Sequence, residues 1–267
     1  MNSICILDFE TTGLMPTSDE IIECALKIYE KPIVYSTLVK PDHVGKAPPG
    51  YRGAYILPKI TEITGITNQM IHKQGICQEM LAKQMYEFFK DNGVKYIVAH
   101  NGEGFDFILL KLLFLKYNYD FTQFLYIDTM YLFKRIFKNM GIKCKSFSQK
   151  NLCELFRIHQ ENAHRAFGDV EDLEQLFYHM VIKYGLHFET YIHYNYPEIY
   201  KLSEGNRVSD NILVYISQLF KLYQSEQTYL QIQQISGRMR SLLYNFIEKN
   251  KLPLFHESGN NTVKFYK

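Results

Sequence analysis

The sequence predicts an α/β layered domain followed by a helical extension. Three apolar runs of strand type come first, near residues 4–7, 21–29 and 33–39, and helical patterns then alternate with single strands. This order of elements is typical of a sheet covered by helices. The composition agrees, because 46% of the 267 residues are hydrophobic and can bury a large core. We therefore expect one α/β domain in residues 1–185 and a helical extension of unknown role in residues 186–267.

The first three strands are expected to form a meander. Residues 21–29 and 33–39 are rich in apolar and β-branched side chains, and residues 30–32, which end in a proline, form the turn between them. The run at residues 4–7 leads directly into Asp8. The meander therefore places an acidic side chain at the end of its first strand.

Later elements alternate between helix and strand. Residues 41–58 contain four prolines and three glycines and are predicted to form a loop. Strands are expected at residues 95–99 and 126–128, and Asp128 is placed to cap the helix that follows it. The predicted helices span residues 78–90, 104–117, 129–138, 148–156 and 163–184.

Two amphipathic helices are predicted in the extension, at about residues 209–224 and 227–249. In the second, apolar side chains step by three and four positions, at Ile232, Ile235, Met239, Leu242 and Phe246. Such a stripe is typical of a helical hairpin that packs on its own domain. The alternative is a surface that contacts a second copy of the chain, a polymerase or another subunit.

Charge and cysteine content bound the class of protein. With 30 Lys and Arg against 28 Asp and Glu, the net charge neither indicates nor excludes a nucleic-acid partner. The five cysteines form no C-x-x-C pair, so we expect reduced thiols in an intracellular protein. No apolar stretch approaches the roughly 20 residues of a membrane span. The apolar run at residues 3–7 is too short for the core of a signal peptide, and Asp8 ends it. We therefore expect a soluble protein of the cytoplasm or nucleus without membrane contact.

The first acidic motif is Asp8-Phe9-Glu10, at the end of the first strand. Residues two apart on a strand lie on the same face, so both carboxylates should project into one site while Phe9 enters the core. Two like charges at a buried strand end are unfavourable unless a cation binds there. Carboxylate oxygens suit Mg²⁺ and Mn²⁺.

Two further motifs carry the other chemical groups. Asp106 lies in the first turn of the helix predicted at residues 104–117, after a strand end where α/β sites assemble. Helix capping is the alternative role for it. His164 stands five residues before Asp169 and can accept a proton from an attacking water. An ordinary surface position is the alternative for this histidine.

These motifs resemble those of the DEDD exonuclease superfamily, in particular its histidine-containing, DnaQ-like branch. The first motif of that branch, D-x-E followed by T-T-G, is matched by residues 8–13. The second is matched by residues 100–106, with one extra residue before the phenylalanine, and the third, H-x-A-x-x-D, by residues 164–169. Residues 63–67 and the pair 128–129 agree with two further blocks of the family.

The resemblance covers roughly residues 2–184 and implies an RNase H-like fold, with a five-stranded mixed sheet flanked by helices. It implies that His164 is the general base. The other branch has a tyrosine where Arg165 stands, so the histidine branch fits better. The resemblance also implies two divalent metal ions, Mg²⁺ or Mn²⁺, bound by Asp8, Glu10, Asp106 and Asp169.

The resemblance further implies contacts with the terminal nucleotide by Thr11, Thr12, Gly13, Leu14, Asn101 and Phe105. Leu14 would wedge against the last base and Phe105 would stack beside it, and core packing is the alternative for both. Residues 131–150 contain no acid and six cations, namely Lys134, Arg135, Lys138, Lys143, Lys145 and Lys150. This basic tract could hold phosphates, and a solvated helix face is the alternative.

We therefore predict an enzyme, a metal-dependent 3′→5′ exonuclease. It would hydrolyse phosphodiester bonds at the 3′ end of single-stranded or frayed nucleic acid and release nucleoside 5′-monophosphates by a two-metal mechanism. DNA is slightly favoured over RNA, because no residue clearly contacts a 2′-hydroxyl. The alternatives are an exoribonuclease of the RNase T or oligoribonuclease type and a non-catalytic nucleic-acid-binding module on the same fold.

Overall fold

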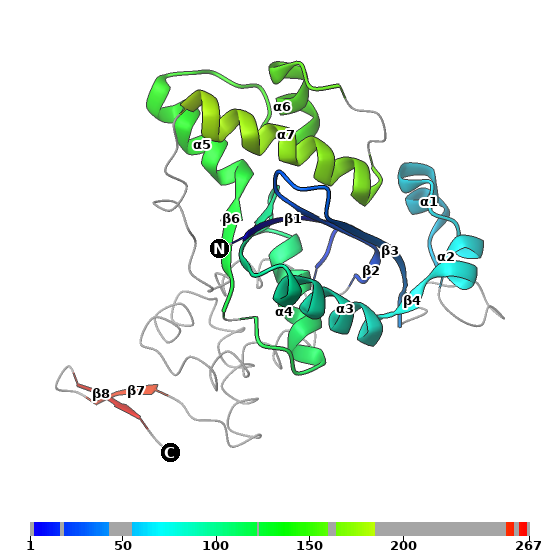
Figure 1. Cartoon of the computed structure of the whole chain (residues 1–267). Coiled ribbons are helices and arrows are strands. Elements are labelled where there is room, and N and C mark those ends of the chain that lie inside the picture. Colours follow the sequence, from blue (N-terminus) through cyan, green and yellow to red (C-terminus); the bar gives the residue numbers. More distant parts are fainter. Residues whose placement is uncertain are drawn as a thin grey trace. The chain divides into compact units, whose positions relative to one another are not determined.

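The computed structural model divides the chain into two compact units, Met1–Asn195 and Tyr196–Lys267. It describes residues 3–16, 19–42, 55–121, 123–159 and 164–184 of the first unit, and 255–258 and 262–265 of the second. In the first unit, helices cover both faces of a central sheet (Figure 1). The predicted α/β fold of RNase H type is confirmed.

The sheet has six strands in the order β4-β3-β2-β1-β5-β6. The first three strands form the predicted antiparallel meander, and β5 and β6 continue the sheet in parallel. The strands are β1 Ser3–Thr11, β2 Ile21–Ile28, β3 Val34–Lys40, β4 Ile76–Cys77, β5 Val94–Ala99 and β6 Leu125–Asp128. The predicted number of five omits β4, whose two residues are too few to show a period.

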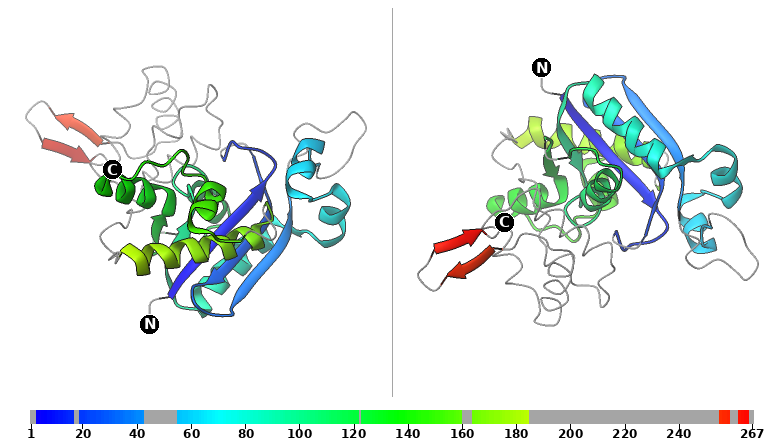
Figure 2. Two further views of the ribbon diagram at one scale, coloured as in Figure 1. Left: turned by 90° about the horizontal axis from the view of Figure 1, so that it is seen from above. Right: turned by 90° about the horizontal axis from the view of Figure 1, so that it is seen from below.

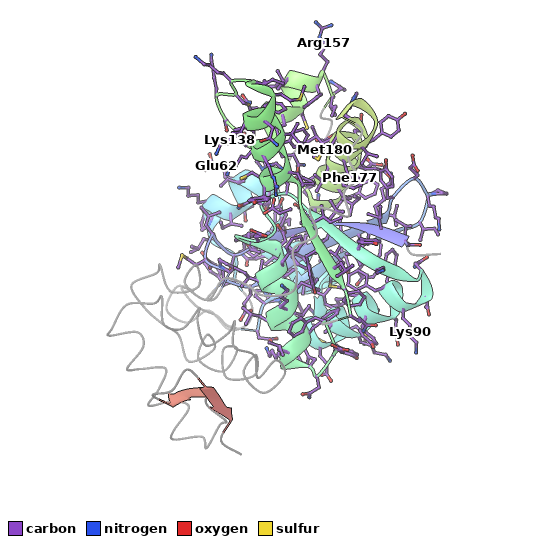
Figure 3. The ribbon with its side chains drawn as sticks, turned by 90° about the vertical axis from the view of Figure 1, so that its left-hand side faces the viewer. Glu62, Lys90, Lys138, Arg157, Phe177 and Met180 are labelled. Atoms are coloured by element: carbon purple, nitrogen blue, oxygen red, sulfur yellow. The ribbon has the colours of Figure 1, made fainter. Side chains whose placement is uncertain are left out.

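Five longer helices form the two outer layers. One face carries α3 Gln78–Asp91 and α4 Asp106–Lys116, and the other carries α5 Thr129–Met140, α6 Gln149–Phe156 and α7 Ala166–Tyr184 (Figure 1). Figure 2 shows α7 lying across β1 and β2. In Figure 3, Phe177 and Met180 of α7 lie on one side of the sheet and Lys90 of α3 on the other.

Burial on both faces of the sheet explains why the sequence of β2 is almost continuously apolar. Ile6 and Ala25 of the sheet are buried against side chains of α5, α6 and α7, which include Leu132, Leu152 and Phe177. Phe9 and Cys24 are also buried. A strand covered on both faces buries both of its sets of side chains, so alternation with polar residues is lost.

Two short helices, α1 Pro58–Thr64 and α2 Asn68–Gln74, were not predicted. They are defined by their ends: Gly65 ends α1 in the left-handed region, and the Thr67 side chain accepts a hydrogen bond from the Met70 N–H at the start of α2. With seven residues each, they are too short to show a clear helical period. Most of the predicted loop at residues 41–58 lies outside the described residues.

The second unit contains an antiparallel strand pair, β7 Phe255–Ser258 and β8 Thr262–Phe265, which was not predicted. The amphipathic helices predicted at residues 209–224 and 227–249 lie outside the described residues, as does the domain boundary predicted at residue 185. Among the helices that the structure describes, none has the length and apolar character to cross a bilayer.

Candidate active site

The structure brings together three of the four predicted metal ligands. Asp8 and Glu10 lie on one face of β1, and Asp169 reaches them from the first turn of α7. One oxygen from each carboxylate lies within 4.8 Å of the others. In the described part of the chain, this is the one group of three or more acids, histidines or cysteines close enough to share an ion.

Asp106, the fourth predicted ligand, is the first residue of α4 and is 4% exposed. Its Oδ1 accepts a hydrogen bond of 3.2 Å from the backbone N–H of Phe9, the residue between Asp8 and Glu10. Asp106 is therefore attached to the same stretch of β1 as the other acids. Its place at the start of α4 also fits the alternative role at a helix N-terminus.

Burial and nearby negative charges raise the pKa of all four carboxyl groups. Burial, and then the negative charges of Asp106 and Asp169, raise the pKa of Asp8 well above its usual range. Burial is also the main cause that raises the pKa of Glu10 to about 8, of Asp106 to about 7 and of Asp169 to about 6. The cluster therefore retains protons at neutral pH unless cations replace them. An all-oxygen donor set with this excess of negative charge suits hard divalent cations.

His164 lies beside the cluster with an exposed side chain. Its backbone N–H donates a hydrogen bond of 3.1 Å to Oδ2 of Asp169. His164 has φ +65°, in the left-handed region, so α7 begins at Ala166 and not at residue 163 as predicted. The side chain is thus presented from a loop at the edge of the acidic cluster.

A second histidine close to the site has a structural role. His100 Nε2 donates to the carbonyl oxygen of Phe147 at 2.7 Å, and its Nδ1 lies 2.9 Å from Oγ1 of Thr129. Burial lowers the pKa of His100 to about 4, so it is neutral at physiological pH. His100 therefore joins the loop after β5 to the segment before α6. Of these two histidines, His164 is the one with an exposed side chain.

The loop after β1 is held by Asp19, which the sequence did not single out. Thr12 Oγ1 donates to Oδ1 of Asp19 at 3.1 Å, and the Met15 N–H donates to Oδ2 at 2.8 Å. A Cβ atom at Gly13 would lie 2.5 Å from the Asp19 carboxylate, so a larger residue there would displace the Asp19 side chain. Leu14, between these anchors, is 88% exposed, which excludes core packing for it.

Each of the other predicted substrate contacts lies within five positions of a predicted metal ligand in the sequence. Thr11, at the end of β1, donates its hydroxyl to the Gly13 carbonyl. Asn101 is exposed with φ +60°, and Phe105 is half-buried at the N-cap of α4, so both lie in the loop that leads to Asp106.

Sequence reasoning missed two further residues that hold this site. Gln149 Nε2 donates to the Asp169 carbonyl at 2.9 Å and to its Oδ1 at 3.3 Å. Asp128, predicted only as a helix cap and confirmed as one, also accepts the backbone N–H groups of Asn101 and Glu103 at 3.1 Å each. These contacts join residues 20 or more positions apart, so no local pattern indicates them.

The fold and the acidic cluster are those of an exonuclease domain. The chain belongs to the RNase T exonuclease family, which its sequence matches over residues 5–177. The predicted resemblance to the DEDD exonucleases is thereby confirmed.

The chain is similar to two bacterial proteins of much greater length. It is 35% identical over 179 residues to the PolC-type DNA polymerase III of Thermotoga petrophila, which covers 66% of this chain and 12% of the polymerase. It is 29% identical over 192 residues to the 3′-5′ exonuclease DinG of Staphylococcus epidermidis, covering 70% of this chain and 19% of that protein. The chain thus spans less than a fifth of the length of these relatives.

Among solved structures, the fold is similar to that of Escherichia coli exonuclease I in complex with a dT13 oligonucleotide. The TM-score is 0.61 at 20% sequence identity, and the match covers 78% of this chain and 47% of the exonuclease. At this identity the likeness concerns the fold.

Proposed function

We propose that the chain is a divalent-metal-dependent 3′→5′ exonuclease that releases nucleoside 5′-monophosphates. The observation that carries the proposal is the meeting of Asp8, Glu10 and Asp169 within 4.8 Å, with Asp106 attached to the same strand. Membership of the exonuclease family and the name of the DinG relative support the reaction and its direction.

The carboxylates have the role of holding two cations, Mg²⁺ or Mn²⁺. When bound, such cations would lower the pKa of an attacking water and stabilise charge on the leaving 3′ oxygen. The raised pKa values of Glu10 and Asp106 mean that binding displaces protons, so metal affinity should increase with pH. His164 would accept the proton of the attacking water, since its exposed side chain lies beside the cluster.

The exposed Leu14 is the residue proposed to meet the terminal base. An apolar side chain that is 88% exposed on a loop fixed by Asp19 is available for stacking or wedging. Thr11, Thr12 and Gly13 carry this side chain toward the acidic cluster, because they directly follow Glu10. Asn101 and Phe105 would border the same nucleotide from the loop after β5.

The basic tract at residues 131–150 is proposed to hold the strand beyond the terminal nucleotide. Its cations are exposed on α5, in the loop after it and in the first turn of α6. Two contacts attach this loop to the site: the Phe147 carbonyl accepts from His100, and Gln149 donates to Asp169. A polyanion leaving the acidic cluster would therefore meet positive charge. DNA is favoured over RNA because the Thermotoga petrophila relative is named a DNA polymerase and the similar structure of exonuclease I contains a dT13 oligonucleotide.

The first experiment follows 5′-labelled single-stranded DNA and RNA oligonucleotides of one sequence with Mg²⁺, Mn²⁺ or EDTA. We expect a metal-dependent ladder that shortens by one nucleotide at a time from the 3′ end, faster on DNA. Asp8→Ala should abolish it, and His164→Ala should slow it by roughly 10²–10⁴-fold. A ladder that is faster on RNA would indicate the exoribonuclease alternative, and no ladder with a folded protein would indicate a binding module.

The basic tract is tested by charge reversal. The double variant K143E/K145E should weaken binding of a long single strand and reduce the salt dependence of binding. The matched control K73E/K90E makes the same charge change at exposed lysines on α2 and α3. Equal effects of the two variants would mean that net charge alone acts, and the solvated-face alternative would hold.

Contact with a polymerase or with a second copy of the chain is proposed for residues 186–267. The support is the polymerase relative, in which this domain is 12% of the chain. To test this proposal, the molecular mass in solution is measured for the full chain and for a version without residues 186–267. Each is measured alone and mixed with a polymerase. Identical behaviour of both versions would contradict an assembly role.

A further inference from the structure

Glu23 and Arg165 form an ion pair beside the acidic cluster that has no part in the proposed chemistry. Glu23 lies on β2, directly opposite Glu10 in the antiparallel register of β1 and β2. Side chains directly opposite one another share a face of the sheet, so Glu23 points to the face of the cluster. It is 2% exposed. A buried carboxylate in such a place requires a positive partner.

Arg165 is this partner, and it directly follows His164. Its Nε donates to Oε1 and Oε2 of Glu23 at 3.1 and 3.0 Å, and its Nη2 also donates to Oε1. The backbone N–H of Ala166, the first residue of α7, donates to Oε2 at 3.0 Å. Glu23 therefore binds the two residues after His164 and satisfies an N–H that has no acceptor within α7.

His164 is held from its other side by Asp169, which accepts its backbone N–H. Its φ of +65° lies in the left-handed region, which residues with a side chain adopt uncommonly. The short segment around His164 is thus attached to the sheet by Glu23 and to α7 by Asp169. These two attachments determine where the His164 side chain emerges.

We propose that Glu23 and Arg165 are positioning residues that hold His164 at the carboxylate cluster in the geometry that proton transfer requires. The inference rests on the proposed function of His164 as the general base. Small displacements of a reacting group reduce the rate strongly, so loss of the ion pair should slow the reaction. The planar fork of arginine binds a carboxylate through two donor nitrogens in a fixed geometry, which the single ammonium group of lysine does not reproduce.

The test measures kcat and KM on a single-stranded DNA oligonucleotide for R165A, R165K and E23Q. We expect each variant to lower kcat by roughly 10- to 100-fold, as for other residues that orient a reacting group, with KM nearly unchanged. Because R165K keeps the charge and loses the fork, it should remain defective. In the H164A background, with long incubations, the same substitutions should cause little further loss, since nothing is left to position.

The matched control is Lys27→Met. Lys27, also on β2, forms ion pairs with two residues of α7, Glu174 at 2.9 Å and Glu171 at 3.7 Å. Among the ion pairs of the described residues, none joins Lys27 to the segment around His164. K27M should leave kcat nearly unchanged. Thermal unfolding and Mn²⁺ binding by calorimetry, measured for every variant, show that fold and metal site are retained.

Three results would overturn the inference. Full activity of R165K would mean that Arg165 acts by charge alone, and an equal loss in K27M would mean that any contact between β2 and α7 suffices. Undiminished losses in the H164A background would mean that the pair acts independently of the histidine. If H164A itself keeps its activity within about threefold, against the 10²-fold or greater loss expected for a general base, the proposed role of His164 is what fails.

Discussion

Asp106→Asn should stabilise the metal-free protein at alkaline pH while it abolishes hydrolysis. Burial raises the pKa of Asp106 to about 7, against the opposing hydrogen bond from the Phe9 N–H. An acid whose pKa rises on folding stabilises the fold below its unfolded pKa, near 4. This contribution is lost as the pH rises through the folded pKa, so the metal-free protein should lose stability between about pH 4 and pH 7.

The magnitude follows from the same values. A tenfold change in proton affinity corresponds to about 1.4 kcal/mol. Between pH 5 and pH 8, an acid with a pKa of about 7 therefore lowers the free energy of unfolding by roughly 2–3 kcal/mol. Glu10, whose pKa burial raises to about 8, acts in the same direction. In the variant, the amide oxygen can still accept the Phe9 N–H.

The assay is urea unfolding in EDTA at pH 5 and pH 8. Wild type should be less stable at pH 8 by more than the roughly 2–3 kcal/mol due to Asp106, because Glu10 adds its own contribution, and D106N should reduce the difference by roughly 2–3 kcal/mol. Mn²⁺ should restore the wild type at pH 8, because the cation binds the ionised cluster. The control D91N, at an exposed position on α3, should change nothing. Equal stability of metal-free wild type at both pH values would refute the reasoning.

Three further predictions concern the loops around the site. Leu14→Ala should raise KM for single strands while it changes the free energy of unfolding by less than about 0.5 kcal/mol, because the side chain is exposed; kinetics beside urea unfolding checks this. Asp19→Asn should weaken the Thr12 and Met15 contacts and lower kcat/KM, with metal binding measured by calorimetry unchanged. Gly102→Ala should cost roughly 1–3 kcal/mol in thermal unfolding, because its Cβ would lie 2.5 Å from the Phe107 ring.

Much of the fold could be predicted because its elements carry a period or a cap. The alternation along β1 indicates that Asp8 and Glu10 share a face, and the apolar stripe of α3 indicates a helix of nearly the observed length. Asp128 follows a strand and precedes a helix, which suffices to predict its capping role. Elements too short for a period, such as α1 and β4, were missed for the same reason.

By itself, the sequence determined the family, the order of the longer strands and helices of the first unit and the chemical character of the site, because motifs and periods are local properties. Only the tertiary structure decided what lies beside what. The approach of Asp169 to Asp8, the burial of Glu23 against Arg165 and the exposure of Leu14 all depend on how α7 and the loops pack on the sheet. Such contacts sum many weak interactions between residues far apart in the chain, and no short window of sequence contains them.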